Sequence, residues 1–205
     1  MKNPIITFLL ILAIITLLLL CIATIVFIIK ILKPQNNYKF YFKNGTHLYD
    51  LAFKDDLTGL FNRNAYIRDL ARLQKKKIKT VWICIFDIDD FKIINDTKGH
   101  LYGDEILILA AKRLLGVFHD KHHTVYRIGG DEFLVISENI SENHLINLLL
   151  ELKHTEIKNN DFRFSKGYSV VTNKGPEHFD HAFNNADEML YADKKSKKKK
   201  TTILS

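Results

Sequence analysis

The chain has 205 residues, and its 30 Lys and Arg residues outnumber 23 Asp and Glu residues, which gives a formal charge of +7. This length suits one domain with an appendage. The 9 Gly, 2 Cys and 14 Phe residues exclude collagen-like, disulfide-stapled and disordered chains. The positive charge lies at the ends, because residues 1–33 carry +3, residues 194–205 carry +6, and residues 34–193 carry −2. A nucleic-acid-binding domain is basic over its working face, so we expect no nucleic acid partner.

The first segment of the chain is strongly apolar. Residues 5–29 form a run of 25 residues without a charge. As a helix this run would be about 37 Å long, enough to cross a hydrocarbon core of about 30 Å. A secretory signal peptide would have a shorter apolar region and a small-residue cleavage site, and a buried core helix would show a polar face. Residues 1–33 are therefore predicted to form an N-terminal transmembrane anchor.

The charges beside this segment predict its orientation. Lys2 precedes the apolar run, whereas four lysines follow it before the first acidic residue: Lys30, Lys33, Lys39 and Lys43. The positive-inside rule then favours a cytoplasmic carboxyl-terminal domain. We expect a single-pass protein of the inner (cytoplasmic) membrane, with the lipid bilayer as a partner and a membrane-embedded partner protein as a possibility.

Further along the chain, helical and strand-like segments alternate. The continuous apolar run VWICIF at 81–86 is typical of a buried strand, and the amphipathic segment 102–118 is typical of a helix. A brief helix is expected from Leu48. The other predicted helices are 64–74, 141–153 and 179–195, and the other predicted strands are 125–128, 133–136 and 162–171. Helices interleaved with a mostly antiparallel sheet predict an α+β fold.

Two acidic clusters lie where predicted strands end. Residues 87–90 read DIDD directly after the buried strand, and Asp131-Glu132 follow a Gly-Gly pair at the tip of a predicted hairpin. If the strands pair side by side, the clusters converge, and oxygen ligands without His or Cys suit Mg²⁺ or Mn²⁺ rather than zinc. The alternative is that these acids are ordinary solvated turn residues. Gly129 and Gly130 either let a bulky ligand approach the backbone or supply positive φ angles.

The sequence lacks the common motifs of other catalytic and metal-binding sites. The sequence has no GxxxxGK[ST] phosphate loop, no HExxH and no GxSxG. His119, His122 and His123 lie in a predicted loop and are interpreted as solvated. Cys21 and Cys84 belong to neither a disulfide framework nor a CxxC metal pair.

A set of motifs in a fixed order carries a family resemblance. Residues 129–133 read GGDEF as they stand, residues 55–63 read DDLTGLFNR, and residues 86–96 read FDIDDFKIIND. Shorter matches follow at Gly99-His100, Gly103-Asp104-Glu105, Ser165-x-Gly167, Ala186-Asp187 and Leu190-Tyr191. Over about residues 48–198 the chain thus resembles the GGDEF diguanylate cyclase family. The resemblance implies a cyclase/polymerase-palm-like (ferredoxin-like) α+β domain at 48–198, a short connector at 34–47 and a basic tail at 199–205.

The resemblance also implies site residues. It implies two Mg²⁺ (or Mn²⁺) ions per active site. The implied metal ligands are Asp87, the Ile88 carbonyl, Asp131 and Glu132. The implied catalytic residues are Asp131 and Lys92. The implied substrate-binding residues are Asn95 and Asp104 for guanine, Gly129 and Gly130, and Lys194 and Lys198 for phosphate.

The reaction implied by this resemblance is the condensation of two GTP molecules. The 3′-hydroxyl of each GTP attacks the α-phosphorus of the other, which yields cyclic di-GMP and two pyrophosphates. Each domain holds one GTP, so the reaction requires a homodimer. The alternative is a catalytically silent GGDEF module that signals or serves as a scaffold through partners at the membrane.

Two positions depart from the family pattern. Many members carry RxxD before GGDEF as a product-inhibition site, but Asp120 and His123 stand there, so no inhibitory product site is expected. Lys198 stands where Arg is usual, which keeps the charge and loses the bidentate fork.

Overall fold

The computed structural model describes residues 48–75, 79–159, 162–171 and 176–203. The chain divides into two units, residues 1–47 and residues 48–205. The predicted anchor at 1–33 and the connector at 34–47 lie outside the described residues. Within the described ranges, no helix is both long and apolar enough to cross a membrane.

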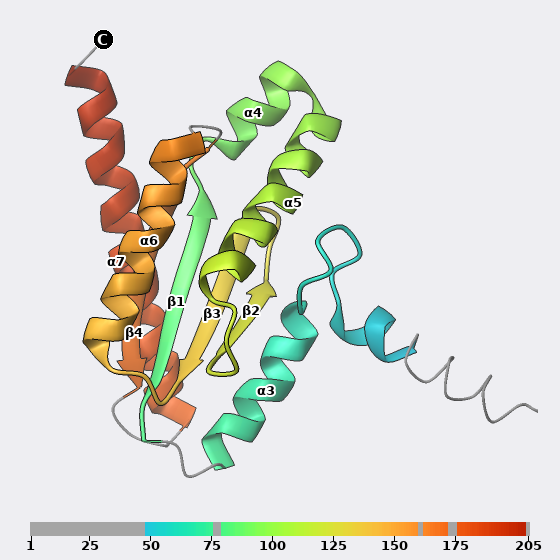
Figure 1. Ribbon diagram of the computed structural model, residues 1–205, viewed down its shortest axis with the longest axis vertical. Helices are drawn as coiled ribbons and strands as arrows, with labels where there is room; N and C mark the ends of the chain where they lie inside the picture. Colours follow the sequence, from blue (N-terminus) through green and yellow to red (C-terminus); the bar gives the residue numbers. More distant parts are fainter. Residues whose placement is uncertain (1–47, 76–78, 160–161, 172–175, 204–205) are drawn as a thin grey trace, which may run out of the picture. The chain divides into compact units, whose positions relative to one another are not determined.

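The second unit combines one sheet with helices (Figure 1). A short helix over 48–53 comes first. The remaining elements are α3 (Arg63–Lys75), β1 (Val81–Ile88), α4 (Phe91–Lys98), α5 (His100–Val117), β2 (His123–Arg127), β3 (Glu132–Glu138), α6 (Glu142–Asn159), β4 (Phe164–Val171) and α7 (Pro176–Ile203). The four strands lie in the order β2-β3-β1-β4, and each neighbouring pair is antiparallel. The predicted α+β architecture is confirmed.

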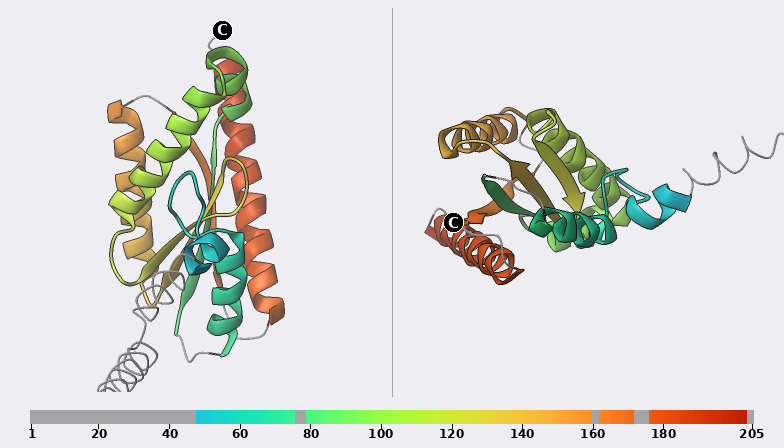
Figure 2. Two further views of the ribbon diagram at one scale, coloured as in Figure 1. Left: turned by 90° about the vertical axis from the view of Figure 1, so that its right-hand side faces the viewer. Right: turned by 90° about the horizontal axis from the view of Figure 1, so that it is seen from below.

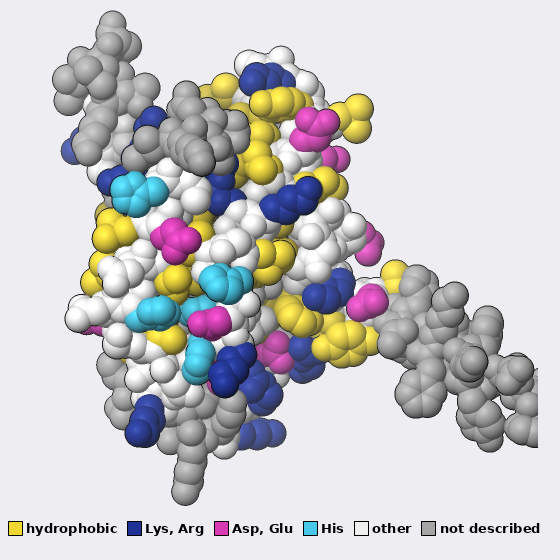
Figure 3. All heavy atoms as spheres, in the orientation of Figure 1, with side chains coloured by type: hydrophobic (Ala, Val, Ile, Leu, Met, Phe, Trp, Pro, Cys, Tyr) yellow, Lys and Arg dark blue, Asp and Glu magenta, His cyan; other side chains and the backbone are white. Residues whose placement is uncertain are grey.

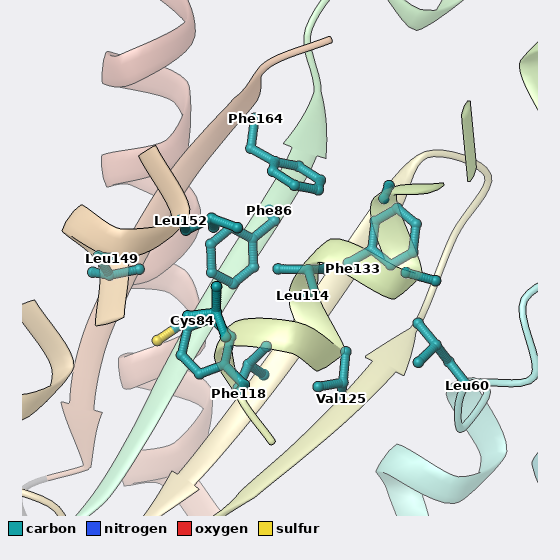
Figure 4. Packing of buried hydrophobic residues seen from close by; sticks show 14 of the residues in the cluster. Leu60, Cys84, Phe86, Leu114, Phe118, Val125, Phe133, Leu149, Leu152 and Phe164 are labelled. Atoms are coloured by element: carbon teal, nitrogen blue, oxygen red, sulfur yellow. The ribbon is translucent and has the colours of Figure 1, made fainter. Parts of the chain in front are cut away.

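Helices cover both faces of the sheet (Figure 2). Alternation of side chains along each strand directs one set of apolar residues to each face. On one face Cys84, Phe86 and Phe133 pack with residues of α5 and α6, as the close view in Figure 4 shows. On the other face Ile83, Ile85 and residues around them pack against α3 and α7. Burial on both faces explains why β1 is a continuous apolar run rather than an alternating one.

Three local expectations differ from the structure. Lys92, which was expected in the loop that carries the acids of 87–90, lies instead in the helix α4, and α7 continues to Ile203, so the predicted helix end at 195 is wrong. His123 is also not a solvated loop residue. It begins β2 opposite Ser137, and its side chain is 1% exposed. Burial lowers the pKa of the His123 imidazole, which favours the neutral ring.

A glycine allows α7 to lie close to β4. A Cβ atom on Gly167 would lie 1.9 Å from the carbonyl oxygen of Ala186 and 2.5 Å from the amide nitrogen of Leu190. Both of these atoms belong to the backbone of α7, so neither can rotate away. The close approach of α7 to the sheet therefore depends on the missing side chain at position 167.

We predict that Gly167→Ala lowers the free energy of unfolding by about 3 kcal/mol, because the added methyl group collides with backbone. Gly116→Ala is the matched control, since Gly116 lies on the exposed side of α5 with nothing within 4 Å of an added Cβ. This control should be neutral or raise stability by about 0.5 kcal/mol. Urea unfolding of the full chain in detergent, followed by the fluorescence of Trp82, measures both changes. Equal stabilities of the two variants would contradict the close contact.

Candidate active site

The predicted convergence of the two acidic clusters is present at one end of the sheet. Asp87 on β1 pairs in register with Glu132 on β3, and the amide of Ile88 donates to the carbonyl oxygen of Asp131 at 3.3 Å. This end of the sheet lies at the arrowhead of β1 in Figure 1. The structure therefore brings together the acids of 87–90 and of the GGDEF turn.

Asp87 has a strained electrostatic environment. Its side chain is buried, and burial is the largest influence and raises its pKa, while the nearby charges of Asp131 and Glu132 raise it further. Against this, Nζ of Lys194 donates to Oδ2 of Asp87 at 2.7 Å and lowers the pKa. The net shift is upward. A divalent cation would relieve the repulsion among these carboxylates, so this set of oxygen donors fits Mg²⁺ or Mn²⁺.

Arg127 links the Gly-Gly turn to a distant segment of the chain. The guanidinium of Arg127 donates from Nε and Nη2 to the carbonyl oxygen of Gly130 at 3.1 and 2.7 Å. Its Nη1 also donates to both carboxylate oxygens of Asp55, at 2.9 and 3.2 Å. Arg127 therefore ties the turn that carries Asp131 to the segment before α3. Neither Arg127 nor Asp55 was assigned a role from sequence, although Asp55 lies within the motif at 55–63 and Arg127 lies two residues before GGDEF.

Asp55 is the carboxylate to which Arg127 is paired. Burial raises the pKa of Asp55, but hydrogen bonds from Thr58 and Arg127 outweigh it and bring the pKa below its usual value. The hydroxyl of Thr58 donates to Oδ1 of Asp55 at 2.6 Å, and its amide donates to the same atom at 2.9 Å. The carboxylate thus stays ionised and holds Arg127 in place.

The glycines of the turn provide room rather than unusual backbone angles. Neither Gly129 nor Gly130 has a positive φ, so the second of the two alternatives from sequence is wrong. A Cβ on Gly129 would lie 2.6 Å from Oε2 of Glu132, whereas one on Gly130 would meet nothing within 4 Å. The side chain of Glu132 therefore occupies the space over Gly129, and the backbone at Gly130 is open to approach.

The helix α7 contributes more to this end of the sheet than sequence indicated. Nζ of Lys197 donates to Oδ2 of Asp89 at 2.9 Å, to Oγ of Ser165 at 3.2 Å, and to the carbonyl oxygen of Phe164. The Ser165 hydroxyl donates to Oδ1 of Asp89. Lys197 was missed because nothing in the sequence shows that the last helix reaches the end of β1.

The residues proposed to bind guanine lie on α4 and α5, which pack together. Gly103 leaves space for Asn95, since a Cβ on Gly103 would lie 1.9 Å from Oδ1 of Asn95. Asn95 is thereby held against the first turns of α5, where Asp104 follows Gly103 and is half-buried. Lys92 is exposed on the first turn of α4, close in sequence to the acids of 87–90.

The two predicted phosphate-binding lysines lie on α7. The ammonium of Lys194 contacts Asp87 and is therefore at the acidic end of the sheet. Lys198 lies one turn further along and is exposed.

Comparison with known proteins accounts for this arrangement. The family model described as "Diguanylate cyclase, GGDEF domain" matches residues 52–200. The chain belongs to this family. The GGDEF domain is therefore the part of the chain that contains β1, the Gly-Gly turn and α7.

Two curated relatives and one solved structure are similar to this chain. The chain is 38% identical over 149 residues to "Probable diguanylate cyclase DgcI" of Escherichia coli, covering 73% of this chain and 33% of the relative. It is 32% identical over 164 residues to a "Diguanylate cyclase" of Vibrio cholerae, covering 76% and 51%. The chain thus spans between a third and a half of these relatives' lengths. The coiled coil and GGDEF domain of DgcB from Caulobacter crescentus, solved in complex with c-di-GMP, shares the fold, with a TM-score of 0.70, 24% identity and coverage of 78% and 90%.

We predict that Asp131→Asn separates stability from cation binding. Removing one of the mutually repelling carboxylates should leave the unfolding temperature without Mg²⁺ unchanged or about 1–2 °C higher. Millimolar Mg²⁺ should raise the unfolding temperature of the unmodified chain by about 3 °C and have no such effect on Asp131→Asn. Differential scanning fluorimetry of the full chain in detergent measures these shifts. An equal response of Asp131→Asn to Mg²⁺ would remove Asp131 from the cation site.

Proposed function

We propose that this chain is a membrane-anchored diguanylate cyclase that condenses two GTP molecules into cyclic di-GMP and two pyrophosphates. The observation that carries the proposal is the meeting of Asp87, Asp131 and Glu132 beside the open backbone of Gly130. Family membership and the curated relatives named as cyclases support the same activity. A silent GGDEF module has no need of a buried carboxylate beside two other acids, an arrangement in which burial first and the neighbouring charges second raise the pKa of Asp87.

The acidic end of the sheet would hold two Mg²⁺ (or Mn²⁺) ions. The oxygens of Asp87, the Ile88 carbonyl, Asp131 and Glu132 would bind them. When bound, such ions lower the pKa of an attacking hydroxyl and neutralise charge on phosphates.

The side chains of this domain have separate parts in the proposed reaction. Asp104 accepts hydrogen bonds from N1–H and the N2 amino group of guanine, and Asn95 completes the contact with the base. Gly130 lets the phosphates approach the backbone, and Gly129 leaves room for the side chain of Glu132. Lys92, Lys194 and Lys198 place positive charge where negative charge develops on the phosphates.

The bond changes balance within two GTP molecules. The 3′-oxygen of one GTP forms a bond to the α-phosphorus of the other, and the bond from that phosphorus to the pyrophosphate oxygen breaks. The hydroxyl proton passes to the carboxylate of Asp131 and then to water. The same exchange in the opposite direction closes the ring.

The proposed reaction needs two domains that face each other, because each domain has one set of guanine-binding residues. A homodimer is therefore part of the proposal. We propose that residues 1–33 anchor the chain in the inner membrane and leave the GGDEF domain in the cytoplasm. The support is the uncharged run of 25 residues and the lysines that follow it.

The full chain in detergent, incubated with GTP and Mg²⁺, is expected to form cyclic di-GMP, detected by chromatography. Specific activity should rise with protein concentration, because the reaction requires a dimer. Asp131→Ala should lower the rate at least about a hundredfold through loss of a metal ligand and proton acceptor. Glu151→Gln, which removes an exposed acid of α6, should leave the rate unchanged. Absence of product at all protein concentrations would instead support the silent signalling or scaffold module.

The anchor has its own test in a bacterial cell that expresses the full chain. We expect the chain in the membrane fraction after a carbonate wash, because a spanning helix is not released by high pH or salt. Deletion of residues 1–33 should move it to the soluble fraction, whereas deletion of residues 199–205 should not. A full chain that the carbonate wash releases would refute the anchor.

A further inference from the structure

A second group of metal-ligating side chains lies at the opposite end of the sheet. Asp120 in the loop after α5, His123 at the start of β2 and His144 in the first turn of α6 each offer one ligand atom, and these atoms lie within 4.8 Å of one another. Figure 3 shows several His side chains gathered with an acidic side chain on the lower part of the face that it draws. His123 pairs with Ser137, which pairs with Trp82, five positions before Asp87 on β1. At the rise of a strand this separates the two sites by about 17 Å.

The imidazole of His123 has an unsatisfied nitrogen. Its side chain is 1% exposed, and its Nε2 is the one buried side-chain nitrogen or oxygen among the described residues that has no hydrogen-bond partner. Its Nδ1 is 2.8 Å from Oγ of Ser137. With Nδ1–H donating to that hydroxyl, Nε2 has a free lone pair that faces Oδ1 of Asp120 at 3.4 Å. A lone pair and a carboxylate oxygen opposite each other are stabilised by a cation between them.

The surroundings hold the His123 ring in place. The ring of Phe118 meets it edge-on at 5.3 Å between centroids, and the ring of His144 lies nearly parallel to it at 6.3 Å. The hydrogen bond to Ser137 fixes the orientation of the ring, as hydrogen bonds from the second nitrogen do in metal sites. His123 is therefore a preset ligand at the base of the cluster.

The other two ligands can move toward a bound ion. His144 is exposed, so its side chain can rotate at little cost. The carboxylate of Asp120 is exposed too, and it already lies 3.4 Å from Nε2 of His123. Zinc with ligands at about 2.1 Å in a tetrahedron needs ligand atoms about 3.4 Å apart. A closure from 4.8 Å to that spacing is within the range of two exposed side chains. The amide of His122 donates to Oδ1 of Asp120 at 2.7 Å and holds that carboxylate, and the amide of His144 donates to Oγ of Ser141 at 3.2 Å and holds the backbone of His144.

We propose that Asp120, His123 and His144 form a binding site for a transition-metal cation of the Zn²⁺ class, with water as the fourth ligand. Two imidazole nitrogens and one carboxylate match zinc and its first-row neighbours, whereas Mg²⁺ and Ca²⁺ prefer oxygen alone. The bound ion links the loop after α5, strand β2 and the start of α6. Asp120 and His123 are the two residues that stand in place of RxxD. This site does not depend on the proposed cyclase activity.

Zinc binding to the full chain in detergent tests the site, measured by competition with a chromogenic chelator in excess Mg²⁺, which occupies oxygen-only sites. We expect one Zn²⁺ per chain, with Co²⁺ giving the visible absorption bands of four-coordinate nitrogen and oxygen ligation. Asp120→Asn, which keeps an acceptor for the amide of His122, and His144→Ala should each weaken zinc binding at least about tenfold. Zinc should also raise the unfolding temperature of the unmodified chain but not of His144→Ala.

His119→Ala is the matched control, because His119 is exposed in the same loop and is not one of the three clustered residues. It should bind zinc like the unmodified chain. The fluorescence of Trp82 reports whether each variant is folded. The site is wrong if the unmodified chain takes up no zinc, or if folded Asp120→Asn and His144→Ala both retain its affinity.

Discussion

The register between β1 and β3 is the constraint on which this domain depends. It sets Asp87 opposite Glu132 and brings the amide of Ile88 to the carbonyl of Asp131. A shift of one residue would move Asp87 to the other face of the sheet, away from Lys194 and α7. The register therefore holds Asp87 beside Asp131 and Glu132, where burial and then the charges of these two acids raise the pKa of Asp87.

Ion pairs around the acidic end of the sheet stabilise this arrangement against the repulsion among its carboxylates. Arg127 joins the Gly-Gly turn to Asp55, and Lys197 joins α7 to Asp89. Both ties are partly buried, so each is worth more than an exposed ion pair. Since Gly167 lets α7 approach the sheet, the same close packing delivers Lys194 and Lys197 to the ends of the strands. The position of α7 is thus set both by its packing against Gly167 and by the ion pairs of Lys194 and Lys197.

Sequence reasoning recovered what is local and missed what depends on distant contacts. The buried run of β1, the Gly-Gly hairpin and the acids at strand ends follow from patterns within a few residues, and the structure brings these acids together. Arg127 and Lys197 could not be assigned because their partners lie 72 and 108 residues away in sequence. His123 was misjudged because the polar segment around it is typical of a loop, whereas pairing with β3 and cover from Phe118 bury its ring.

The structure gives Lys194 a second role beside the one that the resemblance implies. The resemblance implies a phosphate contact, and the structure shows its ammonium on Asp87. The side chain is 36% exposed, and its long stem is flexible enough to reach either partner. As the counter-charge of a buried carboxylate, Lys194 lowers the cost of keeping Asp87 ionised. The same ionised form is the one that can bind a divalent cation, so Lys194 keeps the acidic end of the sheet ready for binding.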